Sequence, residues 1–175
     1  MKKVLIGFVI AVMAIVIAGF IAPRHIEVVH TSTIQAPATA VFNEVNDLER
    51  WADWSYWNQL YEGDMKVVFG EIRSGTGGSY TWDGDESGKG KITITESIPF
   101  QSIKVDLDFM EQGTAKSWYT FKEEGSNTIL TQGFRSDMGM NPIMRLVGII
   151  LLKPEMNNAF RHNANQLQKI TRIRP

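Results

Sequence analysis

The chain has 175 residues, a formal net charge of −1 and no cysteine. This length suits one domain with a substantial hydrophobic core and is short for two. The balanced charge, without a basic stripe, argues against a nucleic-acid partner, and the lack of cysteine excludes disulfides, thiolate nucleophiles and cysteine metal sites.

An uncharged apolar run occupies residues 4–22. About 19 helical residues at ~1.5 Å each come close to the ~30 Å thickness of a bilayer core. The competing interpretation is a cleaved signal peptide, which would have an apolar region of about 7–15 residues and a small-x-small cleavage site. Here Ala22 is followed by proline, and Phe20 stands where a small residue is required. We therefore expect residues 1–23 to form an uncleaved anchor ahead of a single domain, residues 24–175.

The charges that flank this run predict its orientation. Two lysines and the amino terminus precede it, whereas Arg24 follows it. Because cytoplasmic flanks carry the excess of positive charge, the pattern favours a cytoplasmic N-terminus and a domain on the extracytoplasmic side. The predicted localisation is that of a single-pass membrane protein.

The first part of the domain combines a strand with short helices. Apolar and polar residues alternate over 26–34, which predicts a first strand, and Pro37 then suits the first turn of a short one-sided helix. The densest aromatic stretch follows, with Trp51 and Trp54 on one face if it is helical. Packing beneath the sheet is the favoured role for these tryptophans and Trp57, and lining the mouth of a pocket is the alternative.

From residue 65 onward the apolar pattern has a period of two. Glycine, proline and asparagine punctuate it, and the short links predict an antiparallel meander. The six expected strands are residues 65–69, 79–83, 90–98, 102–110, 115–123 and 127–136.

The C-terminal stretch, residues 141–172, reads as a short apolar helix, a break at Pro154 and a longer amphipathic helix. One side of that helix carries Met156, Phe160, Ala164, Leu167 and Ile170. Strands with one apolar face each need a cover, so we expect the sheet to curl around this helix and to leave a pocket between them.

Four stretches carry a resemblance to a known family. They are WADWSYW at 51–57, GTGGSYTWDG at 75–84, GKG with ITITE over 88–96, and NPIMR at 141–145. With them, the chain after Pro23 resembles the polyketide cyclase/dehydrase-like (SRPBCC) branch of the START/Bet v 1-like superfamily, many members of which carry an N-terminal membrane segment.

The resemblance implies an α+β helix-grip fold. In it, a curved antiparallel sheet of about seven strands wraps a long C-terminal helix, here preceded by one transmembrane helix. It implies no catalytic residues, because the superfamily includes lipid carriers, plant hormone receptors, cyclases, quinone-binding proteins and chaperone activators.

Three patterns that resemble binding motifs are better explained by structure. The glycines at 75–78 precede a strand instead of a helix, so they form a turn and not a phosphate cradle. Residues 83–88 imitate the opening of a calcium loop, but Ile94 stands where the closing glutamate should be. The three histidines lack ligand spacing, so no metal and no cofactor is predicted.

Polar side chains in phase with apolar strand faces suggest the ligand site. Glu96 shares its parity with Ile92 and Ile94, and a buried carboxylate needs a partner, water or an opening. Two interpretations follow: Glu96 orients a ligand, or it reaches solvent at a strand end. If the last strand has the other register, Arg135 contacts an anionic head group. The residues predicted to contact ligand are Tyr80, Trp82, Glu96, Phe109, Tyr119, Gln132, Phe134 and Phe160.

The sequence thus predicts a membrane-anchored domain that binds or carries a hydrophobic small molecule or lipid. One alternative is an enzyme of cyclase/dehydrase type that acts on such a ligand, with Glu96 or Tyr119 as general acid or base. The other is a protein-interaction module related to chaperone activators.

Overall fold

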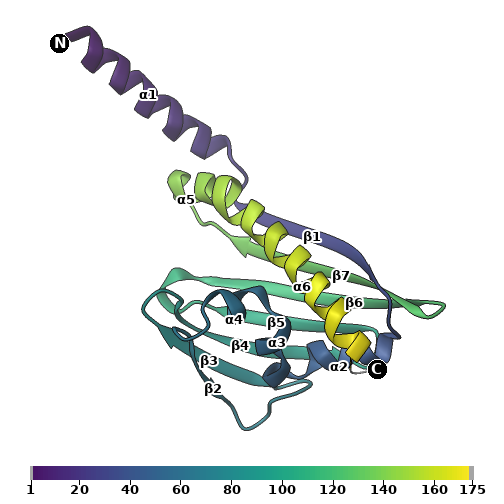
Figure 1. The fold of residues 1–175 in the computed structure, drawn as a ribbon. Coiled ribbons are helices and arrows are strands. Elements are labelled where there is room, and N and C mark those ends of the chain that lie inside the picture. The colour runs from purple at the N-terminus through teal and green to yellow at the C-terminus, as the bar shows by residue number, and fades with distance from the viewer. Residues whose placement is uncertain (1, 174–175) are drawn as a thin grey trace.

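The computed structural model describes residues 2–173 (Figure 1), so Arg174 and Pro175 of the predicted domain lie outside the described part. Its helices are α1 (Lys2–Ile21), α2 (Ala38–Asn46), η1 (Leu48–Arg50), α3 (Trp51–Trp54), α4 (Tyr56–Leu60), η2 (Met110–Gln112), α5 (Pro142–Val147), η3 (Gly148–Leu152) and α6 (Lys153–Ile173). Its strands are β1 (His25–Ile34), β2 (Lys66–Phe69), β3 (Ser79–Gly84), β4 (Gly88–Ile98), β5 (Ser102–Asp108), β6 (Thr114–Glu124) and β7 (Asn127–Asp137).

The seven strands form one antiparallel sheet in the order β1-β7-β6-β5-β4-β3-β2. Strands β2 to β7 follow one another as a meander, and β1 pairs with β7. The curved sheet holds α6 against its concave side (Figure 1). This arrangement confirms the helix-grip architecture expected from the sequence.

The expected inward register holds along most strands. Ile103 and Val105 of β5, and Leu130 and Phe134 of β7, are buried, whereas Arg135 is exposed on the outer face. A two-residue period with one buried face fixes this register. The alternative in which Arg135 faces the interior is therefore wrong.

The register prediction fails at the end of β4. Ile94 pairs with Val105 but Glu96 pairs with Lys104, so Thr95 forms a β-bulge. An extra residue in one strand reverses the side-chain parity beyond it. Contrary to the prediction from the sequence, Glu96 and Ile98 therefore do not share the inward face with Ile94, and Ile98 is exposed.

The chain stays helical through Pro154, so the predicted break there is wrong. Asn141 caps α5 by accepting the N–H of Ile143 at 2.9 Å, and η3 is a π-helical turn in which the Lys153 N–H bonds to the carbonyl of Gly148. Proline lacks an N–H and crowds the carbonyl four residues earlier. The wider π turn, placed directly before the proline, accommodates both effects without ending the helix.

A buried hydrogen-bond network fastens α6 to the sheet. Gln132 of β7 donates to the carbonyl of Phe160 at 3.0 Å, and its own amide oxygen accepts from Asn163 at 3.4 Å. The Asn163 oxygen accepts the backbone N–H of Tyr56 at 2.8 Å. One polar cluster therefore joins β7, α6 and the start of α4.

The tryptophans of α3 have the structural role favoured above. Trp51 and Trp54 are buried, and their indole N–H groups donate to the carbonyls of Val45 at 2.9 Å and Glu44 at 3.1 Å. These bonds hold α3 against α2. Trp57 is half-buried, nearer the surface.

Helix α1 is the one helix within residues 2–173 that is long and apolar enough to cross a membrane. It has 20 residues, projects away from the domain (Figure 1), and exposes nearly all of its side chains. Length and composition thus meet the requirement for a span.

We predict that Asn163→Leu lowers the free energy of unfolding of residues 24–175 by about 2–4 kcal/mol, because it leaves the Tyr56 N–H and the Gln132 oxygen without their partner. Urea unfolding followed by tryptophan fluorescence measures this loss. Asn165→Leu, at an exposed position of the same helix, is the matched control and should change stability by less than about 0.5 kcal/mol. Equal effects of the two substitutions would contradict the network.

Candidate ligand-binding cavity

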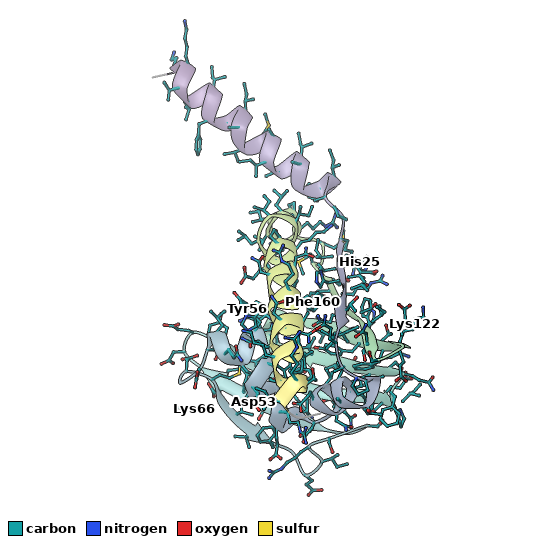
Figure 2. All side chains as sticks on the ribbon, turned by 45° about the vertical axis from the view of Figure 1, so that its right-hand side comes forward. His25, Asp53, Tyr56, Lys66, Lys122 and Phe160 are labelled. Carbon is teal, nitrogen blue, oxygen red and sulfur yellow. The ribbon has the colours of Figure 1, made fainter. Side chains whose placement is uncertain are left out.

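A cavity of about 360 Å³ lies between the inner face of β3–β6, helices α3 and α4, and α6. Figure 2 shows α6 running through the middle of the domain, with Phe160 near its centre. Six of the predicted ligand-contacting residues line the cavity: Tyr80, Trp82, Phe109, Tyr119, Phe134 and Phe160. The volume falls within the ~300–1,000 Å³ typical of small-molecule sites.

Aromatic rings form a continuous wall on the sheet side. Tyr80 contacts Trp51 and Trp82 edge to face, with ring centroids 6.4 and 6.2 Å apart, and Trp82 contacts Phe109 at 5.9 Å. Tyr119 meets Trp51 at 6.1 Å. Edge-to-face pairs prefer such separations, so each ring supports the next and the wall keeps its shape. Trp51 therefore combines its packing role with a place in the lining.

Apart from Glu86 at the mouth, the polar side chains that line the cavity are neutral. Burial raises the pKa of Tyr80 and of Tyr119 above the ordinary tyrosine value, so both hydroxyls stay protonated at neutral pH. Ser117 donates to the carbonyl of Gly133 at 2.8 Å. A neutral, largely aromatic wall favours an apolar guest that carries few hydrogen-bonding groups.

Two predicted residues do not line the cavity. Glu96 is partly exposed and forms an ion pair with Lys104 at 2.9 Å, because the bulge at Thr95 turns it away. Its solvent-facing alternative is therefore the correct one. Gln132 is fully buried, but both ends of its amide are bonded to α6, so it holds the helix in place.

The mouth of the cavity contains residues that the sequence did not point to. They come from α4, η2 and the β3–β4 turn: Asn58, Tyr61, Ser87, Gly88 and Gln112. No periodic pattern marks them, since they lie in loops and helix ends that meet only in three dimensions. The sequence signal that exists is the punctuation itself, the Gly88 turn and the glycine after Gln112.

Asp64 organises the β3–β4 turn at this mouth. Its carboxylate accepts the backbone N–H groups of Asp85 at 2.9 Å, Ser87 at 2.8 Å and, at 3.3 Å, Glu86. The Ser87 N–H in particular lowers the pKa of Asp64 below its ordinary value. The segment that imitates a calcium loop is thus a turn bound by a carboxylate, and the described residues include no cluster of three or more His, Cys, Asp or Glu side chains that could hold a metal ion.

Two tryptophans pack directly over glycines on neighbouring strands, one on each face of the sheet. Inside, a Cβ on Gly90 would lie 2.3 Å from the Trp82 ring; outside, a Cβ on Gly133 would lie 1.9 Å from the Trp118 ring. Glycine lets each indole lie flat on the backbone. Gly90 therefore determines how far the Trp82 ring extends into the cavity.

Neither the protein-family models nor the curated proteins include a match to this chain. Solved structures do match. The di-domain ARO/CYC protein StfQ of the steffimycin biosynthetic pathway is 9% identical, with a TM-score of 0.67 over 86% of this chain, which spans about half (51%) of that one. Protein SA2116 of Staphylococcus aureus, of unknown function, is 10% identical, with a TM-score of 0.64 over 85% of this chain and 94% of its own.

Ara h 8.0201 is also 10% identical, with a TM-score of 0.58 over 84% of this chain and 97% of its own. The chain has the Bet v 1-like helix-grip fold. At these identities the likeness concerns the fold alone, which the di-domain ARO/CYC proteins StfQ and BexL share.

We predict that Gly90→Ala pushes the Trp82 ring into the cavity and weakens binding of an apolar dye such as anilinonaphthalene sulfonate to residues 24–175 by about tenfold or more. Fluorescence titration measures the change. Gly133→Ala, which creates a similar clash on the outer face, should destabilise the domain and leave dye affinity unchanged. Loss of affinity in both variants would show that the dye does not report on the cavity.

We predict that Asp64→Asn frees the β3–β4 turn. The folded-state pKa of Asp64 is depressed. The stabilisation that its carboxylate gives to the turn is therefore present above the unfolded-state pKa of about 3.9, and it is lost as the pH falls through the lower folded-state pKa. At neutral pH the Asp64 carboxylate therefore holds the turn by its hydrogen bonds, and hydrogen exchange of peptides covering 84–88 should be faster in Asp64→Asn. Glu86→Gln, in the same turn, is the control, and unchanged exchange in Asp64→Asn would contradict this role of Asp64.

Proposed function

We propose that this protein binds or carries a hydrophobic small molecule or lipid in the cavity between the sheet and α6. The observation that carries the proposal is the hollow itself, lined by aromatic rings and neutral hydroxyl groups. Dense packing is the rule in protein interiors, so a cavity of this size is itself a reason to expect an occupant. The ARO/CYC neighbours support a site of this kind on the same fold.

Binding is favoured here over catalysis. Glu96, the first candidate for general acid or base, lies outside the cavity in an ion pair with Lys104. Tyr119 remains in the wall, but burial raises its pKa, so the hydroxyl stays protonated and is therefore unavailable as a base and weaker as an acid than an ordinary tyrosine. Among the cavity-lining residues of the described chain, Glu86 is the one carboxylate, and it lies in the exposed turn at the mouth.

We further propose that α1 anchors the protein in a membrane, with the N-terminus in the cytoplasm and the domain on the far side. The length and composition of α1 and the two lysines before its apolar run support this arrangement. A tether of this kind raises the effective concentration of the domain near any ligand that dissolves in the bilayer. Anchor and cavity then serve the same class of ligand.

We predict that the full chain, purified in mild detergent and exchanged into volatile buffer, retains a hydrophobic compound visible by native mass spectrometry. Ala159→Phe should abolish this retention, because Ala159 is fully buried in the cavity wall of α6 and the larger ring would fill the space. Asn158→Phe, at the adjacent exposed position, is the control and should retain the compound. No bound compound in the unmodified protein, or equal retention in both variants, would contradict the proposal.

A further inference from the structure

An exposed apolar patch lies beside the point where α1 meets the domain. It consists of Met140, Ile143, Met144, Ile150 and Leu151, whose side chains are 46–68% exposed. We call these residues the α5–η3 patch. A group of several large exposed apolar side chains from adjoining helical segments indicates an interaction site, whereas single exposed apolar residues elsewhere on the domain are ordinary.

The patch has a fixed position relative to the end of α1. Gly19 packs so closely on α5 that a Cβ there would lie 2.4 Å from the Pro142 carbonyl oxygen. Arg145 of α5 donates to the carbonyls of Phe20 at 3.3 Å and Ala22 at 3.5 Å. These carbonyls belong to the end of the apolar helix, where a cation is favourable. Figure 1 shows α5 directly beside the end of α1.

Two large apolar residues of η3 face outward. Ile149 and Leu152 pack against the core, whereas Ile150 and Leu151, which lie between them in the helix, are exposed. Two large aliphatic side chains are therefore exposed close to α5 in the chain. In water such exposure is unfavourable, whereas the acyl-chain boundary of a bilayer accommodates it.

We propose that the α5–η3 patch inserts into the surface of the membrane that α1 crosses. The bilayer is the occupant that the structure favours, because α5, which carries part of the patch, packs directly on the last turns of the apolar helix α1. Lys153, two residues after Leu151, is exposed and carries a positive charge that can meet lipid phosphates, whereas Arg24 is paired with Asp137. The inference rests on the proposed membrane anchor.

Docking in this way brings the cavity to the lipid. Leu152 lines the cavity, and the residue before it, Leu151, belongs to the patch. Met156, one turn further along α6, continues the lining. The docked patch would therefore hold the Leu152 side of the cavity wall next to the bilayer.

The absence of cysteine allows a direct test with single nitroxide labels on the full chain, reconstituted in phosphatidylcholine vesicles. Labels at Ile150→Cys and Leu151→Cys report the patch. Ile15→Cys in α1 is the lipid-facing reference, and Val68→Cys on β2, 67% exposed, is the matched reference outside the patch. Collision rates with oxygen and with a water-soluble nickel complex are measured by power-saturation electron paramagnetic resonance.

We expect the two patch labels to favour oxygen over nickel as Ile15 does, and Val68 to favour nickel. Patch labels that behave like Val68 would overturn the inference. Shielding of the patch from both reagents would overturn it in favour of a second protein, including another copy of this chain. A nickel-accessible label at Ile15 would overturn it together with the anchor.

The labels report their surroundings whether or not the cavity is filled, so the two proposals fail separately. Water-exposed patch labels in a protein that retains a hydrophobic compound refute the docking alone. Lipid-facing patch labels in a protein that retains none refute the carrier function alone. All labelled positions are exposed, and thermal unfolding of each variant checks that the fold is unchanged.

Discussion

The concave face of the sheet is the constraint on which the rest of this structure depends. Each strand from β3 to β7 presents apolar side chains to that face, and burying them requires a cover. Helix α6 supplies it only in part, because it lies nearest β1 and β7 and is tied there by Gln132. The space over β3–β6 is left to the aromatic rings and to α3 and α4, and there the cavity remains.

The polar network keeps the cavity open. A helix packed only by apolar contacts could settle deeper into the sheet and close the space, since apolar contact is non-directional. Directional hydrogen bonds from Gln132 to Phe160 and from Asn163 to Tyr56 fix the height and rotation of α6 instead. The buried amides thus hold the helix where the rings can form a wall without filling the interior.

Much of this was predictable from the sequence, because it follows from periodicity. The two-residue period predicted the strands, their order as a meander and the cavity-lining side chains Tyr80, Trp82, Tyr119 and Phe134, and the helical repeat predicted Phe160; Phe109, also predicted, lies just beyond the end of β5. The prediction failed where one residue is added to a regular repeat. Thr95 is as suited to a regular strand as to a bulge, so nothing in the local sequence shows that Glu96 turns outward.

Gln132 illustrates a different limit. Its inward parity was correctly predicted, but parity does not reveal whether a buried amide meets a ligand or a backbone carbonyl of α6. The same applies to the Asp83–Gly88 turn, whose oxygen-rich residues resemble ion ligands. Its N–H groups are instead bound by Asp64, from before β2. Such pairings depend on tertiary approach, which local patterns do not encode.

The helical segment around η3 connects the cavity to the surface beside α1. Ile149, Leu152 and Met156 follow the three- and four-residue spacing of one helical face, and this face packs on the core across the π turn. Leu152 on this face lines the cavity, whereas Leu151, about 100° further around the helix, is exposed beside α5. Because α5 in turn packs on Gly19 of α1, neighbouring residues of one helical segment contribute both to the cavity wall and to the surface next to the apolar helix.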